Sequence, residues 1–406
     1  MVCGLMMATP ACRWLALAFV FAAAPVSAQL DNAVWATPRA LGPTDYLQTR
    51  GGEIVDSGGK PVRLRGVNIG GWLVTEGWMC GQADKYKSGR GALEQLEERF
   101  GPERAAVLMT AWYDHWFTAK DLDQIQSWGF NVIRVPFGYR TLQDAAGNWK
   151  RDAAGAIDFA RMDWVVREAG QRGIYVIFDL HIWPRQIEKD QYGLPSRWSP
   201  EGRAVRAKMQ LLWSAVAKHF KGNGTIAGFD VINEPEGSPW NAPHHAFADA
   251  IREQDPKRMV IVEWCGYEKM GKEFPTNTVY SDHYTFKDET SLEKYRASLK
   301  AHPEIKVPLF LGEMKAGQDN AKAARWMAAA MNKEGWHWAV WTYKGVNVGG
   351  WAAFNYHGTM RYDLSKDSYE SLRDKWTTGL SQWQDPAKPK NYYVNQWWID
   401  GFRQSR

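Results

Sequence analysis

Long apolar runs are scarce in this sequence. One lies near the N-terminus: WLALAFVFAAAPV follows Arg13 and precedes Val26-Ser27-Ala28, a small-x-small cleavage pattern before Gln29. The run is too short for a permanent membrane-spanning helix, and no later stretch is long and apolar enough for one. The pattern predicts a secretory signal peptide over residues 1–28 and a mature chain without a membrane span, exported to the periplasm or the medium.

Cysteine is also rare, and basic residues form no block. Of the four cysteines, only Cys80 and Cys265 remain after the expected cleavage, which excludes a disulfide scaffold. The two can pair in an oxidising compartment or stay as buried thiols. No Cys/His spacing is typical of zinc, and we expect neither a metal nor an organic cofactor. The net charge of +5 is spread along the chain, so nucleic acid is not an expected partner. The oligomeric state is not indicated.

Tryptophan, in contrast, is abundant. The chain has 23 tryptophans, and a core does not need that many indoles because their N–H groups require partners. We therefore expect many of them to line a surface or cleft. The apolar faces of sugars are one class of ligand that stacks on such rings.

Strands and helices alternate along most of the chain. After a lead-in over residues 29–50, a turn at Ser57-Gly58-Gly59-Lys60-Pro61 predicts a hairpin. Eight near-continuous apolar strands then alternate with helices, and a parallel sheet is expected. The predicted strands are Leu64–Ile69, Asn131–Phe137, Tyr175–His181, Gly228–Asn233, Arg258–Trp264, Val279–Tyr284, Val307–Glu313 and Trp338–Tyr343.

Eight such strands indicate one α/β domain, a closed (β/α)8 TIM barrel over residues 51–385. A doubly wound open sheet is the alternative, but no GxGxxG turn follows the first strand. Residues 386–406 form an aromatic tail that we expect to pack on the barrel. Neither an internal repeat nor a linker to a second domain is present.

Polar residues stand at nearly every predicted strand end, where chemistry gathers in such a barrel. One polar strand end is usually only the start of a loop, but this series predicts a site. Its members are Asn68, Glu76, Arg134, His181, Asn233, Glu234, Glu263, His283, Tyr284, Glu313 and Trp341. Glu236 and Glu263 are further acids at the mouth, which we expect to be solvated, to stabilise loops or, for Glu263, to bind substrate hydroxyls.

Two of these carboxylates, Glu234 after FDVIN and Glu313 after PLFLG, follow apolar runs and face the same mouth. A pair of carboxyl groups across a cleft is what glycoside hydrolysis requires. Arg134 can keep one of them ionised. Among the neighbours, Asn233 can donate to a sugar hydroxyl and Trp341 can form a floor beneath a sugar ring. His181 and His283 offer further hydrogen bonds.

At these residues the sequence resembles glycoside hydrolase family 5, the large cellulase-like family of retaining (β/α)8 enzymes. The resemblance covers about residues 52–376 and depends on IRVP, FDLH, INEP, DHY, LGEM and WTYKG in order. It implies that Glu234 is the acid/base and Glu313 the nucleophile.

The resemblance also implies roles for the neighbouring residues. Arg134 and Tyr284 would contact the nucleophile, and Asn233 would bind the 2-hydroxyl. The remaining three, His181, His283 and Trp341, would shape the −1 subsite. The histidine and tyrosine of DHY are adjacent here, whereas the family commonly separates them by one residue, so Tyr284 departs from the family pattern.

Two motifs bear on the substrate. The opening LRGVNIGGWLVTEGW is similar to that of the exo-β-1,3-glucanase branch, in which the residue matching Glu76 binds the non-reducing sugar. The later WTYKGVNVGGW is closer to branches that cleave glucosylceramide and oligoglucosides. Together they predict a retaining β-glycosidase acting on β-glucan or gluco-oligosaccharides, with the linkage open. The alternatives are an endo-β-1,4-glucanase, a same-family enzyme for mannan, xyloglucan or glycolipid, and an inactive carbohydrate-binding barrel.

Overall fold

Eight parallel strands close into a barrel in the computed structural model, which describes residues 39–83, 91–184, 199–235, 241–263, 276–303, 305–315, 319–356, 361–380 and 392–403. Around the barrel the strand order is β10-β3-β4-β5-β6-β7-β8-β9, so chain neighbours are also neighbours in space. The bounds are β3 Arg65–Asn68, β4 Val132–Gly138, β5 Tyr175–Ile182, β6 Ile226–Asp230, β7 Met259–Glu263, β8 Thr278–His283, β9 Leu309–Glu313 and β10 His337–Val340. The predicted TIM barrel is confirmed.

Several predicted strands are longer than the observed ones at their C-terminal ends. β6 ends at Asp230, the last residue that pairs with β7, so Asn233 and Glu234 lie in the loop beyond it. β10 ends at Val340, which places Trp341 beyond that strand. These residues still lie at the mouth of the barrel, but on loop backbone that can take unusual conformations.

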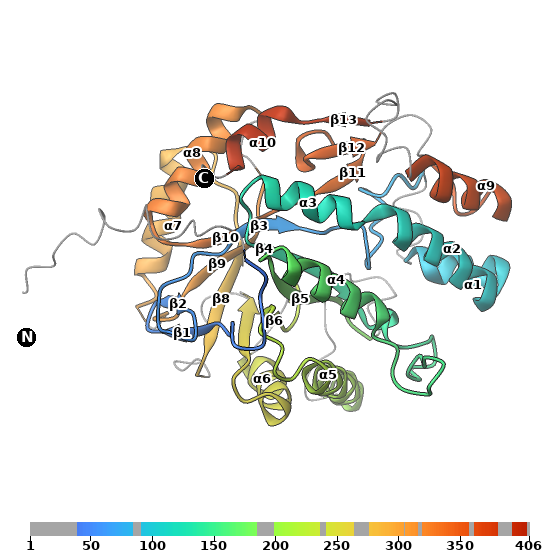
Figure 1. Cartoon of the computed structure of the whole chain (residues 1–406), viewed down its shortest axis with the longest axis horizontal. Coiled ribbons are helices and arrows are strands. Elements are labelled where there is room, and N and C mark those ends of the chain that lie inside the picture. The colour runs from blue at the N-terminus through green and yellow to red at the C-terminus, as the bar shows by residue number, and fades with distance from the viewer. Residues whose placement is uncertain are drawn as a thin grey trace, which may run out of the picture. The chain divides into compact units, whose positions relative to one another are not determined.

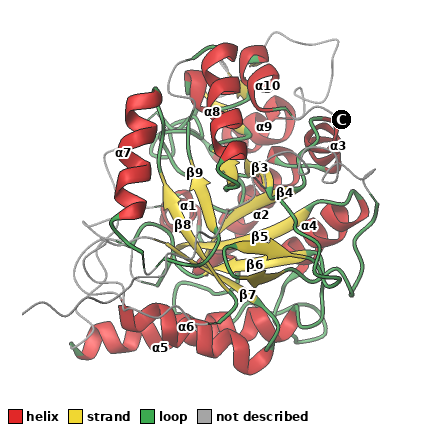
Figure 2. Ribbon diagram, turned by 90° about the vertical axis from the view of Figure 1, so that its left-hand side faces the viewer, coloured by secondary structure: helices red, strands yellow, loops and turns green. Residues whose placement is uncertain are grey.

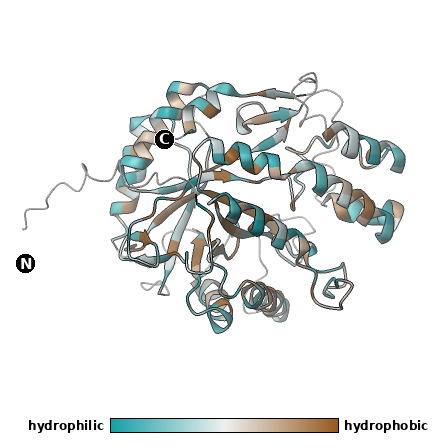
Figure 3. Cartoon of the chain, in the orientation of Figure 1, coloured by the Kyte–Doolittle hydropathy of each residue, from teal (hydrophilic) through white to brown (hydrophobic). Residues whose placement is uncertain are grey.

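Helices cover the outside of the barrel (Figures 1 and 2). Their bounds are α1 Ala92–Phe100, α2 Pro102–Trp116, α3 Ala119–Ser127, α4 Ala160–Gln171, α5 Pro200–His219, α6 Asn241–Gln254, α7 Glu289–Lys300, α8 Ala321–Lys333 and α9 Tyr369–Asp374. Side-chain caps mark several starts, with Ser199, Asp288 and Asn320 each accepting a backbone N–H of the first turn. The helices carry both hydrophobic and hydrophilic residues, as amphipathic helices do (Figure 3).

The inside of the barrel has two layers of different chemistry. Side chains alternate along a strand, so every second residue points inward. Towards the N-terminal ends of the strands these residues form one apolar cluster, here called the lower layer: Leu64, Val132, Tyr175, Ile177, Ala227, Met259, Ile261, Val279, Phe310 and Ala339. Two residues further along β4, β5 and β7 the same alternation brings in Arg134, Asp179 and Glu263, which together with Asp230 and Glu313 are here called the upper layer.

An N-terminal hairpin adds to the lower layer. β1 (Gln48–Arg50) pairs antiparallel with β2 (Glu53–Val55), and Leu47 and Ile54 join the apolar cluster. The expected turn is present, since the Asp56 N–H donates to the Lys60 carbonyl at 2.9 Å and the Val62 N–H donates to the Ile54 carbonyl at 2.9 Å. β1 itself was not predicted, because the lead-in has no periodic pattern.

The expectation that many indoles line a surface is wrong for the described residues, where Trp351 is the exposed tryptophan. The others are buried in the core or lie partly buried against it, and several indole N–H groups donate to backbone carbonyls. Trp112 donates to Gly71 at 2.8 Å, Trp116 to Gly70 at 3.0 Å and Trp213 to Val231 at 2.9 Å. These three indoles find their partners inside the fold, whereas the buried Nε1 atoms of Trp376 and Trp398 have no hydrogen-bond partner among the described residues. A high tryptophan count therefore does not by itself indicate a ligand surface.

The C-terminal part of the chain adds a small sheet and a last helix, α10. β11 (Lys344–Val346), β12 (Phe354–Tyr356) and β13 (Tyr392–Val394) pair side by side, with η2 (Tyr139–Thr141), η4 (Gly349–Trp351) and η6 (Lys375–Gly379) as short turns elsewhere. α10 (Gln396–Phe402) lies against α8, where a Cβ on Gly401 would come within 2.1 Å of the Ala324 Cβ.

Some of the sequence predictions concern residues outside the described ranges. The expected signal peptide, Glu236 and Cys265 lie there, whereas Cys80 is a buried free thiol. No helix among the described residues is long and apolar enough to cross a membrane.

Candidate active site

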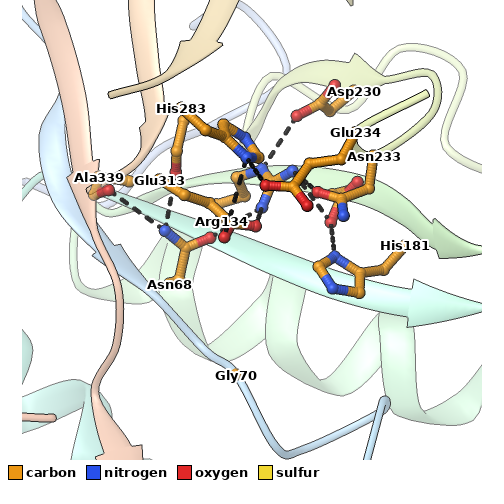
Figure 4. A network of polar contacts seen from close by, with 12 residues as sticks. Asn68, Gly70, Arg134, His181, Asp230, Asn233, Glu234, His283, Glu313 and Ala339 are labelled. Carbon is orange, nitrogen blue, oxygen red and sulfur yellow. Dashed lines mark hydrogen bonds and ion pairs between the residues drawn. The ribbon is translucent and has the colours of Figure 1, made fainter. Parts of the chain in front are cut away.

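Arg134 lies at the centre of the site, fully buried on β4 (Figure 4). Four carboxylates surround its guanidinium: Asp179 at 3.1 Å, Asp230 at 2.9 Å, Glu263 at 2.7 Å and Glu313 at 2.7 Å. Although burial opposes it, these carboxylates raise the pKa of Arg134 well above its usual value. A buried charge of this kind is stable only when it is paired, so Arg134 and its carboxylates form one unit.

Glu313, the last residue of β9, extends from this unit into the mouth. Its Oε1 accepts from Arg134 Nη1 at 2.7 Å, and its side chain keeps 16% of its surface exposed. Burial raises the pKa of Glu313, while the charges of His283 and Arg134 act in the opposite direction. The carboxylate is therefore fixed by Arg134 on one oxygen and accessible to a substrate.

Glu234 stands opposite, in the loop after β6, with 41% of its side chain exposed. Its φ of 39° lies in the left-handed region, which costs a non-glycine residue on the order of 1–3 kcal/mol. The backbone is held there because the Glu234 N–H donates to Glu263 Oε2 at 2.6 Å. Strain of this kind is typical of positions where a side chain must be presented for function.

His283 lies between the two glutamates. Its Nδ1 is 2.8 Å from Glu234 Oε1 and 3.9 Å from Glu313 Oε2, and its Nε2 is 3.2 Å from Glu263 Oε1. The strand register shifts between Asp282 and His283, which re-aims the imidazole as a β-bulge does. A Cβ on Gly312 would come within 3.1 Å of His283 Nε2, so the glycine of LGEM leaves room for this ring.

His283 changes the protonation expected for Glu234. With two facing carboxylates alone, the charge of Glu313 would favour a protonated Glu234. The hydrogen bond from His283 lowers the pKa of Glu234, although burial acts in the other direction. Burial opposes a charge on His283, but the Glu263 and Glu313 carboxylates raise its pKa well above the usual value. Both pKa shifts favour a protonated His283 beside an ionised Glu234 in the free site, joined by the 2.8 Å hydrogen bond.

The spacing of the two glutamates bears on the chemistry they can perform. Carboxylate oxygens of Glu234 and Glu313 and a ring nitrogen of His283 all lie within 4.8 Å of one another. Carboxyl groups about 5–5.5 Å apart suit a direct attack on the anomeric carbon, whereas about 6.5–9.5 Å leaves room for a water. An approach of one oxygen from each glutamate to within 4.8 Å is compatible with the closer of these two arrangements.

His181 and Trp341 form one wall beside the glutamates. Their rings stack with centroids 5.7 Å apart, and Asp179 accepts the His181 Nδ1–H at 2.7 Å. Although burial opposes it, the Asp179 charge raises the pKa of His181 to about 9. Glu76 lies 4.0 Å from His181 Nε2, and burial raises the pKa of this acid. All three expected residues are therefore brought to the mouth together.

Asn233 lies in the site with a group free to donate, whereas Tyr284 makes no hydrogen bond to Glu313 in the described part of the chain. Asn233 Oδ1 accepts from Arg134 Nη2 at 2.9 Å, which leaves its Nδ2 as the group that can donate. The Tyr284 ring packs on Tyr295 at 4.7 Å and on Phe286 at 5.1 Å between centroids. Among the described residues no hydrogen bond joins Tyr284 to Glu313, because the adjacent placement of His283 and Tyr284 turns the two side chains in different directions.

The sequence did not predict that Asp179 and Asp230 belong to the site, and it predicted a solvated, loop-stabilising or substrate-binding acid at Glu263. All three are buried, with exposed fractions of 0%, 0% and 2%. The alternation of β-strands was the available signal, because Asp179 lies two residues before His181 and therefore on the same inward face.

The same carboxylates raise the question of a metal. Oxygen atoms of Asp179, Asp230 and Glu263 lie within 4.8 Å of one another, a spacing at which carboxylates can hold a cation. Arg134 already occupies that position, since its Nε and Nη2 contact all three within 3.1 Å. The donor set is thus built around a guanidinium, and a metal ion does not fit beside it.

The chain is similar to known proteins. The family model described as "Cellulase (glycosyl hydrolase family 5)" matches residues 96–347, more than half of the chain. A "Beta-xylosidase" of Phanerodontia chrysosporium is 26% identical over 81% of this chain and 67% of its own length. A "Probable glucan 1,3-beta-glucosidase A" of Aspergillus niger is 30% identical over 42% of this chain and 41% of its own.

Solved structures agree on the fold. An endogalactoceramidase superposes with a TM-score of 0.56 at 17% identity, covering 90% of this chain and 85% of its own. A β-glucanase from Saccharophagus degradans has a TM-score of 0.51 at 16% identity, covering 86% of this chain and 97% of its own. At such identities the likeness concerns the barrel alone.

Proposed function

This chain belongs to glycoside hydrolase family 5 and is an O-glycosyl hydrolase, and on that premise we propose that it cleaves β-glucosidic bonds of glucans or gluco-oligosaccharides with retention. The observation that supports retention is the close approach of Glu234 and Glu313, since one carboxylate oxygen of each lies within 4.8 Å of the other. Arg134 and His283 hold the two acids in place.

In the proposed reaction Glu313 attacks the anomeric carbon as a carboxylate. The bond to the leaving oxygen breaks, and Glu234 gives that oxygen its proton. The resulting ester joins the sugar to Glu313. In the second step Glu234 takes a proton from a water molecule, whose oxygen attacks the anomeric carbon, and Glu313 leaves as a carboxylate again.

The proton for the first step is supplied by the Glu234–His283 pair. It lies on His283 in the free site, and the 2.8 Å hydrogen bond lets it move to Glu234 before cleavage. When Glu313 becomes an ester its negative charge disappears. This lowers the pKa of His283 and leaves Glu234 free to act as the base.

The −1 sugar would lie between the wall of His181 and Trp341 and the donor amide of Asn233. Trp341 offers a ring face at this position, and Glu76 and His181 offer hydrogen-bonding groups for sugar hydroxyls. By its resemblance to the exo-β-1,3-glucanase branch, Glu76, 4.0 Å from His181 Nε2, would bind a terminal, non-reducing glucose. The glucan 1,3-beta-glucosidase names among the relatives are in line with this proposal.

A second candidate is action on β-xylosidic bonds. It is favoured by the β-xylosidase match, which covers 81% of this chain against 42% for the A. niger glucosidase. The matches span about two thirds or less of these relatives' own lengths, so their names are guides to substrates for testing.

Product analysis separates the candidates. Wild type and Glu313→Gln are incubated with β-1,3-glucan, β-1,4-glucan, xylo-oligosaccharides and short β-glucosides, and the products are separated by chromatography. We expect glucose from β-1,3-linked ends with wild type and no product with the variant. Release of xylose and no glucose would support the second candidate, action on β-xylosidic bonds. Oligosaccharides from β-1,4 chains would indicate an endoglucanase, and no product from any of them would refute the substrate proposal.

We also propose export of the mature chain from Gln29 onward, on the strength of the N-terminal cleavage pattern. N-terminal sequencing of protein recovered outside the cytoplasm tests this, and an intact Met1 or Met6 end would contradict it.

A further inference from the structure

Glu263 ends β7 beneath the two catalytic glutamates and contacts both halves of the machinery. Its Oε2 accepts the Glu234 N–H at 2.6 Å, and its Oε1 lies 2.7 Å from Arg134 Nη2 and 3.2 Å from His283 Nε2. Only 3% of its side chain is exposed, so it cannot touch a substrate. Its function must therefore be exerted through its neighbours.

Glu234 is a residue that needs such support. Its φ of 39° is unfavourable for a side chain that is not glycine, and its carboxylate is the most exposed of the group. The backbone end of Glu234 is bonded directly by Glu263. The carboxylate end is bonded by His283, whose other nitrogen faces Glu263.

We propose that Glu263 is a positioning residue that fixes the acid/base Glu234 from both ends, directly at its backbone and through His283 at its carboxylate. The proposal rests on the proposed function of Glu234 and Glu313. It assigns to Glu263 neither substrate binding nor a proton transfer of its own.

The alternative is that Glu263 merely helps to hold Arg134 and thereby the nucleophile. Arg134 has other carboxylate partners for that purpose, Asp179 at 3.1 Å and Asp230 at 2.9 Å. Asp179 provides the matched control, because it is buried and bonds Arg134 and His181 but forms no hydrogen bond or ion pair with Glu234 or His283 among the described residues. Loss of Asp179 disturbs the nucleophile's side of the site, whereas loss of Glu263 disturbs both sides.

The dependence of rate on the leaving group distinguishes the two roles. A dinitrophenolate departs without a proton, whereas a phenolate needs the general acid. Glu263→Gln is compared with wild type on phenyl and dinitrophenyl β-glycosides of the sugar that product analysis identifies, using kcat/KM, which reports the first step. Gln has one acceptor oxygen for three donors, so in either orientation its NH2 group faces the Glu234 N–H or His283, and one of the two supports of Glu234 is lost.

We expect kcat/KM of Glu263→Gln to fall at least about tenfold more for the phenyl glycoside than for the dinitrophenyl glycoside, since a general acid contributes about 10²- to 10⁴-fold. Asp179→Asn should lower both values by similar factors. An equal loss on the two substrates with Glu263→Gln would overturn the proposal and assign Glu263 to Arg134 alone.

Two further variants keep the result interpretable. Glu234→Gln must itself show the larger loss on the phenyl glycoside. If it does not, the acid role in the proposed function fails rather than the role of Glu263. If circular dichroism shows that Glu263→Gln is unfolded, Glu263→Asp is measured in the same way, because it keeps the charge and is one methylene too short to reach both Glu234 and His283. An equal loss on both substrates there would also overturn the proposal.

Discussion

The lower and upper layers of this barrel are built by the same strands and the same alternation of side chains, yet they have opposite chemistry. Below lies a sealed apolar cluster that includes Val132, Ile177, Ile261 and Phe310. Above it, two residues further along β4, β5 and β7, lie Arg134, Asp179 and Glu263. A shift of two residues along a strand therefore separates the apolar core residues from the charged residues of the site.

The difference shows how the fold can hold a charged centre inside itself. The upper layer contains more carboxylates than cations, and burial alone would make each of these charges unfavourable. Arg134 compensates Asp179, Asp230, Glu263 and Glu313 at distances of 2.7–3.1 Å. The lower layer provides the stability that lets the upper layer keep this arrangement. Substitutions in the two layers should therefore separate activity from stability.

The largest expected effect on activity comes from Glu313→Gln in the upper layer. We expect kcat/KM to fall by more than about a thousandfold, because the attacking carboxylate is lost. The melting temperature should change little, since Gln keeps the shape and its oxygen can still accept from Arg134. Initial rates and thermal unfolding measure both. Residual activity above about a thousandth of wild type would count against the nucleophile role.

Arg134→Met and Ile177→Ala compare the two layers directly. Removing Arg134 leaves several buried carboxylates without their cation and should cost about 3–5 kcal/mol together with nearly all activity. Ile177→Ala leaves a cavity in the lower layer and should cost about 2–5 kcal/mol while the folded enzyme keeps its kcat. Urea unfolding and steady-state kinetics give the two quantities. A strong loss of kcat in Ile177→Ala would show that the layers are not separable.

How much of this was visible in the sequence differs between the layers. The apolar runs predicted all eight strands, and polar residues at their ends predicted Glu234, Glu313, Arg134, His181 and His283 at one mouth. Asp179, Asp230 and the buried role of Glu263 were not predicted. A carboxylate inside an apolar run has no local signal of its cation, because Arg134 is distant in sequence and meets these acids only when the barrel closes.

For Tyr284 the reverse holds: the family resemblance predicted a contact that the structure does not show. The motif suggested a contact with Glu313, but the missing spacer residue turns the ring onto Tyr295 and Phe286. The unusual spacing was visible in the sequence, and its consequence required the three-dimensional course of β8.

The pH dependence of kcat/KM gives a moderate effect that tests the upper layer's charges. Glu313 must be ionised, and burial raises its pKa, so the acidic limb should lie above the ordinary glutamate range. The Glu234–His283 pair must keep one proton. Because the pKa of His283 is raised well above its usual value, the alkaline limb should lie above the ordinary histidine range. An alkaline limb near pH 6.5, the usual histidine pKa, would contradict the assignment of the proton.

The smallest effect is expected for Tyr284→Phe. The hydroxyl makes no hydrogen bond to Glu313 among the described residues, so kcat/KM should stay within about threefold of wild type, less than 1 kcal/mol. Steady-state kinetics on the identified substrate measures it. A loss of a hundredfold or more would restore the role implied by the family motif and contradict the observed ring position.

The most direct test of the central claim, that Glu234 and Glu313 act together by double displacement, is the anomeric configuration of the first product. Proton NMR during cleavage of a β-glycoside shows which anomer appears before mutarotation. The short spacing of the two carboxylates predicts that the β-anomer appears first. The α-anomer appearing first would mean inversion, with water attacking directly, and would contradict the nucleophile role of Glu313.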